Sequence, residues 1–370
     1  MATNYLLEFI QNHPNDWEEK LSSDPYNLKI SRDGPYVMFK YNQLSSDFSN
    51  PIVREARGII FREDNWKCVR RAFDKFFNYG EDNAATIDWT TAVVEEKVDG
   101  TLVSAWFDRD KWHYSTNGTI DIDKAMVNDM QFATFGAIFD AALKQRALTR
   151  KDLERYLSAQ FCYTFELVSP QTRVVVPYAK PDLYLTGVRE MASGAEFDPT
   201  CSWVADCLPS PTRYALTSVE QVVAAAEALP WDKEGYVVVD NQFSRVKIKS
   251  PAYVMAHYAR NNNVITPRAL LEVVFAGEQE EFLTYAADYA DELAKIERAY
   301  QYVVDSLNYA KCAVQPTNFP DRKAFADAVK RQDGWKQGFL FAPDTDAESW
   351  ARAKWAPRKW VELFEELKLI

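Results

Sequence analysis

The sequence of 370 residues predicts an α+β fold in two parts. Two antiparallel sheets with flanking helices are expected over residues 1–250, and an all-helical domain over residues 251–370. Before residue 250, short apolar and β-branched runs come in blocks, with turn-forming residues between them and helical stretches between the blocks. An α+β fold accounts for this order better than alternating βαβ units do. After Pro251 the apolar residues recur with helical spacing.

In the first part, helix and strand signals follow one another along the chain. Residues 1–25 have a helical pattern, with Asn15-Asp16 as a cap before Trp17. A strand, a tight Asp-Gly turn and a second strand are expected around Lys97. Ser218 and Gln221 predict a capping box for a helix that runs through Leu229. Further strands are predicted at 36–41, 58–61, 112–115, 161–167, 173–176, 183–188, 235–239 and 243–248, and a helical region at 122–158.

The second part contains one long predicted helix. Apolar residues step by four and three from Phe282 to Leu307, which predicts an amphipathic helix of about eight turns within a helical bundle. Shorter helices are predicted at residues 322–331 and 358–369.

Composition and charge exclude several classes of protein. The net charge of −11 argues against a basic coat for duplex DNA, although it permits a local basic groove for a nucleic acid. No run approaches 18 apolar residues, and the N-terminal residues lack a signal-peptide pattern, so no membrane partner is expected. Five scattered cysteines and three histidines predict no disulfide frame, zinc site or catalytic triad. We expect a cytoplasmic protein.

Cations near strand ends are the first candidates for chemistry. The chain has neither a Gly-x-x-x-x-Gly-Lys loop nor a Gly-x-Gly-x-x-Gly motif, so side-chain cations must hold any nucleotide phosphates. The candidates are Arg57, Lys75, Lys97, Lys247 and Lys249. Alternation along a strand turns Lys247 and Lys249 to one face and Ile248 to the core. Two adjacent like charges fit either a protected edge strand or an anion site, and both interpretations stay open here.

Two glutamates occupy comparable places. Glu166 lies within an apolar strand pattern, and Glu234 directly precedes another. A carboxylate in such a setting either points to solvent or is buried and paired, and the pattern alone fits both alternatives.

Taken together, these residues belong to a series of short motifs in a fixed order. The series resembles the covalent nucleotidyltransferases, which are ATP-dependent ligases and capping enzymes. Within them it most resembles the phage single-stranded RNA ligase 1 family, because the Lys-Phe-Phe-Asn element and the long third motif separate that family from DNA ligases and capping enzymes. The motifs are Ala56-Arg57-Gly58-Ile59-Ile60-Phe61, Lys75-Phe76-Phe77-Asn78, Lys97-Val98-Asp99-Gly100, Phe165-Glu166-Leu167-Val168-Ser169-Pro170-Gln171-Thr172-Arg173-Val174-Val175, Glu234-Gly235-Tyr236-Val237-Val238-Val239 and Lys247-Ile248-Lys249-Ser250.

The resemblance implies a three-step joining of RNA ends. Lys97 would attack the α-phosphate of ATP to form a lysyl-AMP enzyme. AMP would then pass to an RNA 5′-phosphate, and an RNA 3′-hydroxyl would displace it. Lys247, Lys249 and Mg²⁺, with Mn²⁺ as an alternative, would activate Lys97 and stabilise charge on the phosphoryl group.

The resemblance also assigns roles around the nucleotide. Glu234 would bind the divalent metal, Glu166 would hydrogen-bond the ribose, and Asp99 would make the turn with some part in catalysis. Gly100 would let the backbone approach the nucleotide closely. The other cofactor-binding residues would be Arg57 and Lys75 on the ATP phosphates, Phe77, Tyr236 and Val237 as pocket walls, and Glu96.

One position departs from the family pattern. Asn117 stands where the family usually has a lysine, before Gly118. An amide can donate a hydrogen bond but brings no charge, so either ATP is held less tightly or another cation substitutes.

The expected partners follow from the same resemblance. They are RNA ends, cleaved tRNA among them, and a separate kinase and phosphatase that prepare those ends. The helical C-terminal domain would recognise the RNA, and a phage protein would act in the host cytoplasm. Two alternatives remain: a ligase acting mainly on DNA or nicked duplexes, and a catalytically silent nucleotide- or RNA-binding relative.

Overall fold

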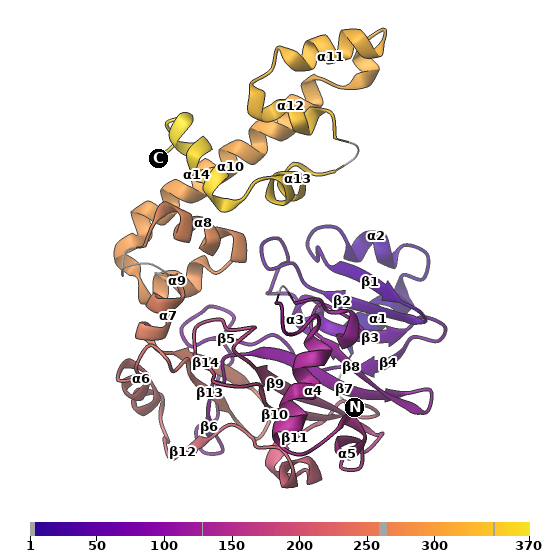
Figure 1. Ribbon diagram of the computed structural model, residues 1–370, viewed down its shortest axis with the longest axis vertical. Coiled ribbons are helices and arrows are strands. Elements are labelled where there is room, and N and C mark those ends of the chain that lie inside the picture. Colours follow the sequence, from indigo (N-terminus) through magenta and orange to yellow (C-terminus); the bar gives the residue numbers. More distant parts are fainter. Residues whose placement is uncertain (1–3, 128, 259–264, 343–344) are drawn as a thin grey trace. The chain divides into compact units, whose positions relative to one another are not determined.

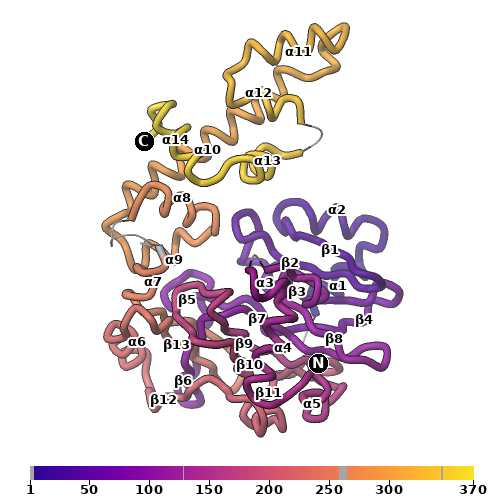
Figure 2. Tube along the Cα trace, viewed as in Figure 1, coloured from indigo at the N-terminus to yellow at the C-terminus, as the bar shows by residue number. Residues whose placement is uncertain are grey.

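The computed structural model describes residues 4–127, 129–258, 265–342 and 345–370 (Figure 1). Figure 2 traces the path of the chain. Contacts divide it into two compact units, Met1–His257 and Tyr258–Ile370. The first unit combines sheets and helices and the second is helical wherever it is described, which confirms the predicted fold class. The division falls at the end of α7 (Pro251–Tyr258), later than the change of sequence pattern at residue 250.

The first sheet is an antiparallel meander with three short helices against it. Its core contains Leu6, Ile10, Val37, Phe39 and Phe61, all almost fully buried. Glu55 ties two of the helices together, because its Oε2 accepts a hydrogen bond from the N–H of Leu6 at 2.7 Å. The elements are α1 (Tyr5–Asn12), α2 (Trp17–Leu21), α3 (Pro51–Glu55), β1 (Lys29–Asp33), β2 (Tyr36–Lys40), β3 (Arg57–Arg62) and β4 (Lys67–Arg70).

The second sheet has five antiparallel strands in the order β11-β10-β9-β7-β8. In Figure 1, α4 lies across this sheet, and Phe139 and Leu143 of α4 are buried with Phe165 of β9 in one core. Trp106 on β7 is fully buried in a further cluster with Met38 and Ile60 of the first sheet. The elements are β7 (Thr101–Asp108), β8 (Lys111–Thr116), β9 (Phe161–Val168), β10 (Asp182–Glu190), β11 (Glu196–Phe197), α4 (Phe135–Gln145) and α5 (Arg150–Glu154).

The third sheet has the order β12-β6-β13-β14-β5, in which β5 runs parallel to β14. The helix α6 covers its core through Val222 and Ala226. The Ser218 hydroxyl caps this helix as predicted. The Gln221 side chain, however, accepts a hydrogen bond from the N–H of Thr217 at 2.9 Å instead of from that of Ser218, so the predicted capping box is only half formed. The elements are β5 (Phe77–Asn78), β6 (Val93–Glu96), β12 (Arg213–Tyr214), β13 (Gly235–Val239), β14 (Arg245–Lys249) and α6 (Val219–Glu227).

Four details of the prediction for this unit were wrong. The strands expected on either side of the Asp-Gly turn after Lys97 do not pair with each other, because β6 belongs to the third sheet and β7 to the second. The described residues form three sheets, where two were expected. The region 122–158 holds only a short 3₁₀ turn (Ile122–Lys124), α4 and α5 as helices. Residues 173–176 form no strand, because the N–H groups of Val175 and Val176 donate to the carboxylate of Asp99 instead of to a neighbouring strand.

The second unit is built around α10, whose buried side includes Leu293, Ile296 and Leu307. The predicted unbroken helix from Phe282 to Leu307 was wrong, since the chain leaves helical geometry at Ala286. The apolar spacing gave no sign of this break, because Phe282 before it and Leu293 after it are both buried. The helices are α8 (Pro267–Ala276), α9 (Gln279–Tyr285), α10 (Ala290–Ala313), α11 (Arg322–Lys330), α12 (Gly334–Leu340), α13 (Ala347–Lys354) and α14 (Pro357–Glu366). Across the described residues, every helix is too short or too polar to span a bilayer.

Candidate active site

Lys97 follows β6, at the point where the chain passes from the third sheet to the second. Antiparallel pairing of β6 with β13 brings it to the start of β13, where its N–H donates to the carbonyl of Gly235 at 2.8 Å. Its Nζ lies 2.6 Å from Oε1 of Glu234. The lysine side chain is 21% exposed and the glutamate 5%, so the pair is largely shielded from water.

A second lysine shares the same carboxylate oxygen. In the pairing of β13 with β14, Gly235 lies opposite Lys249, and the Nζ of Lys249 is 3.6 Å from Oε1 of Glu234. The other oxygen of Glu234, Oε2, is buried and has no hydrogen-bond partner among the described residues. A buried carboxylate oxygen without a donor is costly, so this oxygen is suited to a cation or a ligand group.

The predicted alternation in β14 is present. Ile248 is 5% exposed and belongs to the core under α6, whereas Lys247 and Lys249 remain partly exposed on the opposite face. Lys247 lies opposite Val237 on β13, so Val237 shares the face of the two lysines.

Tyr236 and Glu96 lie opposite each other and on the other face of the sheet from Lys247 and Val237. Tyr236 is buried in the α6 core. Glu96 pairs with the Nζ of Lys233 at 2.9 Å. These two predicted cofactor-binding residues are therefore not brought together with the lysine pair.

Asp99 anchors the loop that carries Lys97. Its Oδ2 accepts hydrogen bonds from the N–H groups of Val175 and Val176 at 3.0 and 2.9 Å, and its Oδ1 accepts one from the hydroxyl of Tyr253 at 3.0 Å. These donors hold a buried carboxylate in place, which fits a positioning role better than proton transfer. Tyr253, on α7, was missed in the sequence, where its only signal is a place four residues after Lys249.

Gly100 is required by the fold. A Cβ at this position would lie 2.5 Å from the carbonyl oxygen of Leu167 on β9. Gly100, directly before β7, therefore has to approach β9 closely, and its approach to a nucleotide stays a prediction.

Glu166 is the second carboxylate of the site. It lies on β9 opposite Leu102 of β7, and its side chain is partly buried. Burial raises its pKa from an ordinary value of 4.5 to about 8; Lys97 and Arg57 oppose this rise, while Glu234 and Asp99 add to it. Lys97, Glu234 and Asp99 therefore lie close enough to Glu166 to change its pKa.

Because the pKa of Glu166 is higher in the folded chain, its contribution to stability is complete below about pH 4.5 and is lost as pH rises towards 8. Glu166→Gln removes this loss. We expect its melting temperature to equal that of the wild type at pH 4 and to exceed it increasingly up to pH 8, by roughly 3 °C or more. Thermal melts across this range measure it. Glu220→Gln, at an exposed position on α6, should give no such trend between pH 5 and 8, and a constant difference for Glu166→Gln would contradict the assignment.

Comparison with known proteins identifies the family. The family model described as RNA ligase matches residues 55–253, which include every site residue described above. The chain belongs to the RNA ligase family. The resemblance drawn from the short motifs is confirmed.

Two relatives found by sequence agree with this membership. The chain is 25% identical to an RNA ligase of Rhodothermus phage RM378, with 96% of each chain covered. It is 30% identical to a protein described as a bifunctional polynucleotide kinase/RNA ligase of Autographa californica nuclear polyhedrosis virus, over 70% of this chain and only 39% of that protein. Among solved structures, an archaeal ATP-dependent RNA ligase has 13% identity, a TM-score of 0.43 and 88% coverage of both chains.

In this RNA ligase, aromatic rings surround the two predicted phosphate-binding cations. The guanidinium of Arg57 lies 4.9 Å from the ring centre of Phe73 and 5.4 Å from that of Phe76. The Nζ of Lys75 lies 4.3 Å from the ring centre of Phe48 and 5.4 Å from that of buried Phe77, and it donates to Gln43 at 3.2 Å. Such rings fix the position of a cation while leaving its charge in place.

A cation also lies beside Asn117. Arg70 is fully buried and donates to the carbonyls of Arg57 and Gly58, to Ser104 Oγ at 2.9 Å and to Asn117 Oδ1 at 2.7 Å. Burial lowers its pKa to about 10. Within the described part of the chain, no carboxylate pairs with it. Arg70 was not predicted as a site residue, because nothing in its strand pattern marks it as buried.

Proposed function

We propose that this RNA ligase seals 5′-phosphate and 3′-hydroxyl RNA ends with ATP, through a lysyl-AMP enzyme and an adenylylated RNA. The observation that carries the proposal is the cluster in which Lys97 and Lys249 share Oε1 of Glu234, at 2.6 and 3.6 Å. Two ammonium groups beside one buried carboxylate contribute little to stability, but together they suit a negatively charged phosphoryl group placed between them.

Each residue of the cluster has a place in the reaction. Lys97 must leave Glu234 and lose a proton before its nitrogen can attack the α-phosphorus of ATP, as the bond to pyrophosphate breaks. An oxygen of the RNA 5′-phosphate then attacks the same phosphorus and releases Lys97. Finally the RNA 3′-hydroxyl attacks the 5′-phosphorus and AMP leaves. Lys249 and Lys247 stabilise the charge that develops on phosphoryl oxygens in these steps.

Glu234 would hold a divalent ion, Mg²⁺ or Mn²⁺. Its buried, unpartnered Oε2 fits a cation, and an oxygen ligand is what these ions prefer. The described residues contain no group of three or more His, Cys, Asp or Glu side chains that could hold a metal, so a single carboxylate together with substrate phosphates is the arrangement that the chain supports. The bound ion would neutralise phosphate charge.

The substrate ends need a source, because sealing requires a 5′-phosphate and a 3′-hydroxyl. We infer that a separate kinase and phosphatase supply them, as the name of the baculovirus relative joins a kinase to a ligase. Cleaved tRNA is the substrate we favour, and the helical unit after residue 257 is its proposed recognition element.

The test is intact mass of the wild-type protein before and after incubation with ATP and Mg²⁺. We expect one added AMP, its removal by pyrophosphate, and sealing of a 5′-phosphorylated single-stranded RNA. Parallel reactions with single-stranded DNA and nicked duplexes decide the preferred polynucleotide. Folded protein that neither carries AMP as purified nor acquires it would refute the ligase proposal.

A further inference from the structure

The first unit contains a cavity of about 940 Å³, whose lining includes Lys75 and Phe77 of the predicted nucleotide site but no residue of the Lys97 cluster. Its walls come from α3, from the segment of Lys75 and Phe76, and from the turn between β13 and β14. Neither Lys97, Glu234, Glu166, Lys247 nor Lys249 lines it. The volume is at the upper end of the range for ligand sites.

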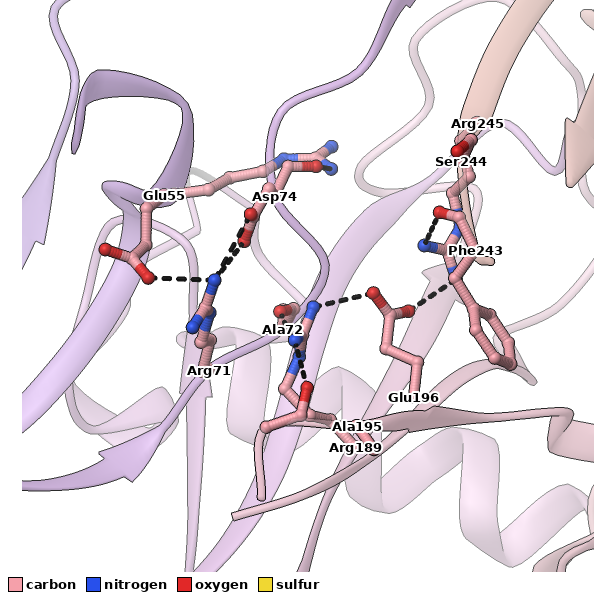
Figure 3. A network of polar contacts seen from close by, with 12 residues as sticks. Glu55, Arg71, Ala72, Asp74, Arg189, Ala195, Glu196, Phe243, Ser244 and Arg245 are labelled. Carbon is pink, nitrogen blue, oxygen red and sulfur yellow. Dashed lines mark hydrogen bonds and ion pairs between the residues drawn. The ribbon is translucent and has the colours of Figure 1, made fainter. Parts of the chain in front are cut away.

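A network of buried ion pairs fixes one wall of this cavity (Figure 3). The two oxygens of Glu196 accept hydrogen bonds from Arg189 and Arg245, each at 2.6 Å. Nearby, Arg71 pairs with Glu55 at 2.8 Å and with Asp74 at 3.2 Å. The first group has two cations and one carboxylate and the second has one cation and two carboxylates, so the two groups together hold this wall without a net charge.

The charge of the cavity is opposite to that of the chain. Five arginine and lysine side chains line it, against three carboxylates, whereas the whole protein has a net charge of −11. Among the described residues, the guanidinium of Arg54 donates only to the carbonyl of Ser49, at 3.4 Å. Asp74 and Glu196 are already paired with arginines. An anion entering this cavity therefore meets a local excess of positive charge.

Aromatic rings and arginines alternate from this cavity to the active site. Arg245 lies 5.6 Å from the ring centre of Phe243 and 5.0 Å from that of Phe73. Arg57 lies on Phe73 at 4.9 Å and on Phe76 at 5.4 Å. Phe243 and Phe76 line the cavity, and Arg57 is one of the cations near Glu166. This row of stacked groups makes the cavity a direct neighbour of the nucleotidyl-transfer site.

Phe243 is held in an unusual backbone conformation. Its φ of 59° is in the left-handed region, which a bulky residue rarely adopts. The turn enforces it, because Oδ1 of Asp240 accepts hydrogen bonds from the N–H groups of Gln242 and Ser244, both at 2.9 Å. Backbone strain of this kind is concentrated at ligand-binding sites.

We propose that this cavity binds a segment of single-stranded RNA next to the end being sealed. Unpaired bases would stack on Phe243 and Phe76, amide groups of Asn83 and Gln242 would meet base edges, and Arg54 would contact a phosphate. Aromatic faces combined with cations are the means by which proteins hold unpaired nucleotides. The inference rests on the proposed function, since it names where that reaction holds its substrate strand.

The test uses Phe243→Leu, which keeps an apolar side chain but removes the ring, and Arg54→Gln. Arg155→Gln, which changes an exposed arginine directly after α5, is the matched control. Three readings are needed for each folded variant: AMP adduct formation from ATP, the KM for a 5′-adenylylated RNA in sealing, and the anisotropy of a labelled single-stranded RNA.

We expect Phe243→Leu and Arg54→Gln each to raise the KM and the dissociation constant for RNA by about tenfold, consistent with the loss of one stacked base or one phosphate contact. AMP adduct formation should stay within twofold of the wild type, and Phe243→Tyr should restore RNA binding. Unchanged RNA constants, or equal losses in adduct formation, would overturn the proposal. If the wild type forms no adduct, the proposed function fails, while the anisotropy still reports on the cavity.

Discussion

Lys97→Ala is expected to abolish formation of the AMP adduct, with a loss of at least about 10⁴-fold in rate. The side chain supplies the atom that forms the bond to phosphorus, and no other described amine occupies its place on Glu234: Lys249 Nζ lies a full 3.6 Å from the same oxygen. Lys97→Arg should be equally inactive, because a guanidinium keeps its proton at any working pH. Intact mass after incubation with ATP and Mg²⁺ measures both variants.

The same variant should retain the last step. A 5′-adenylylated RNA already carries AMP, so its sealing requires the charge-stabilising residues but not the nucleophile. We expect Lys97→Ala to join such an RNA to a 3′-hydroxyl at a measurable rate, without ATP. An AMP adduct on Lys97→Ala, or a wild-type adduct located on another residue by peptide mass, would refute the assignment of the nucleophile.

The sequence predicted those parts of the site that depend on local pattern. Alternation placed Lys247 and Lys249 on one face with Ile248 in the core, because a strand has a period of two whatever it pairs with. The pattern around Lys97 also predicted a strand that ends just before it, but it did not predict that the next strand would belong to another sheet.

Features that depend on long-range pairing could not be predicted. The contact of Lys97 with Glu234 arises from the register of β6 with β13, which no local pattern specifies. The donors to Asp99 come from two places far along the chain, residues 175–176 and Tyr253, and the first of these forms no strand, contrary to the prediction. The motif resemblance predicted Glu234 as a site residue. Only the structure shows that Lys97 and Lys249 share its Oε1 and that its Oε2 has no hydrogen-bond partner among the described residues.

Arg70 and Phe243 illustrate a second limit. A buried arginine without a carboxylate and a phenylalanine with positive φ both contradict the usual preferences of their residue types, so the sequence gives no reason to expect either. Departures from local preferences of this kind are expected at functional sites. In this chain one lies beside Asn117 and the other at the cavity of about 940 Å³.

Lys249→Met is expected to slow adenylylation by roughly 10²–10³-fold, the usual effect of losing one preorganised donor to a developing charge. Unlike Lys97→Ala, it should also slow the sealing of 5′-adenylylated RNA, because a phosphoryl group passes through the same charged cluster in every step.

Methionine keeps most of the apolar stem of a side chain that is only 15% exposed, so Lys249→Met should still fold. Lys233→Met, which removes an exposed lysine that precedes β13 and pairs with Glu96, is the control and should leave both rates unchanged. Single-turnover rates for the two reactions, measured with ATP and with adenylylated RNA, separate the roles. Full activity of Lys249→Met in the sealing of adenylylated RNA would limit Lys249 to the first step and contradict its role as a stabiliser of phosphoryl charge throughout the reaction.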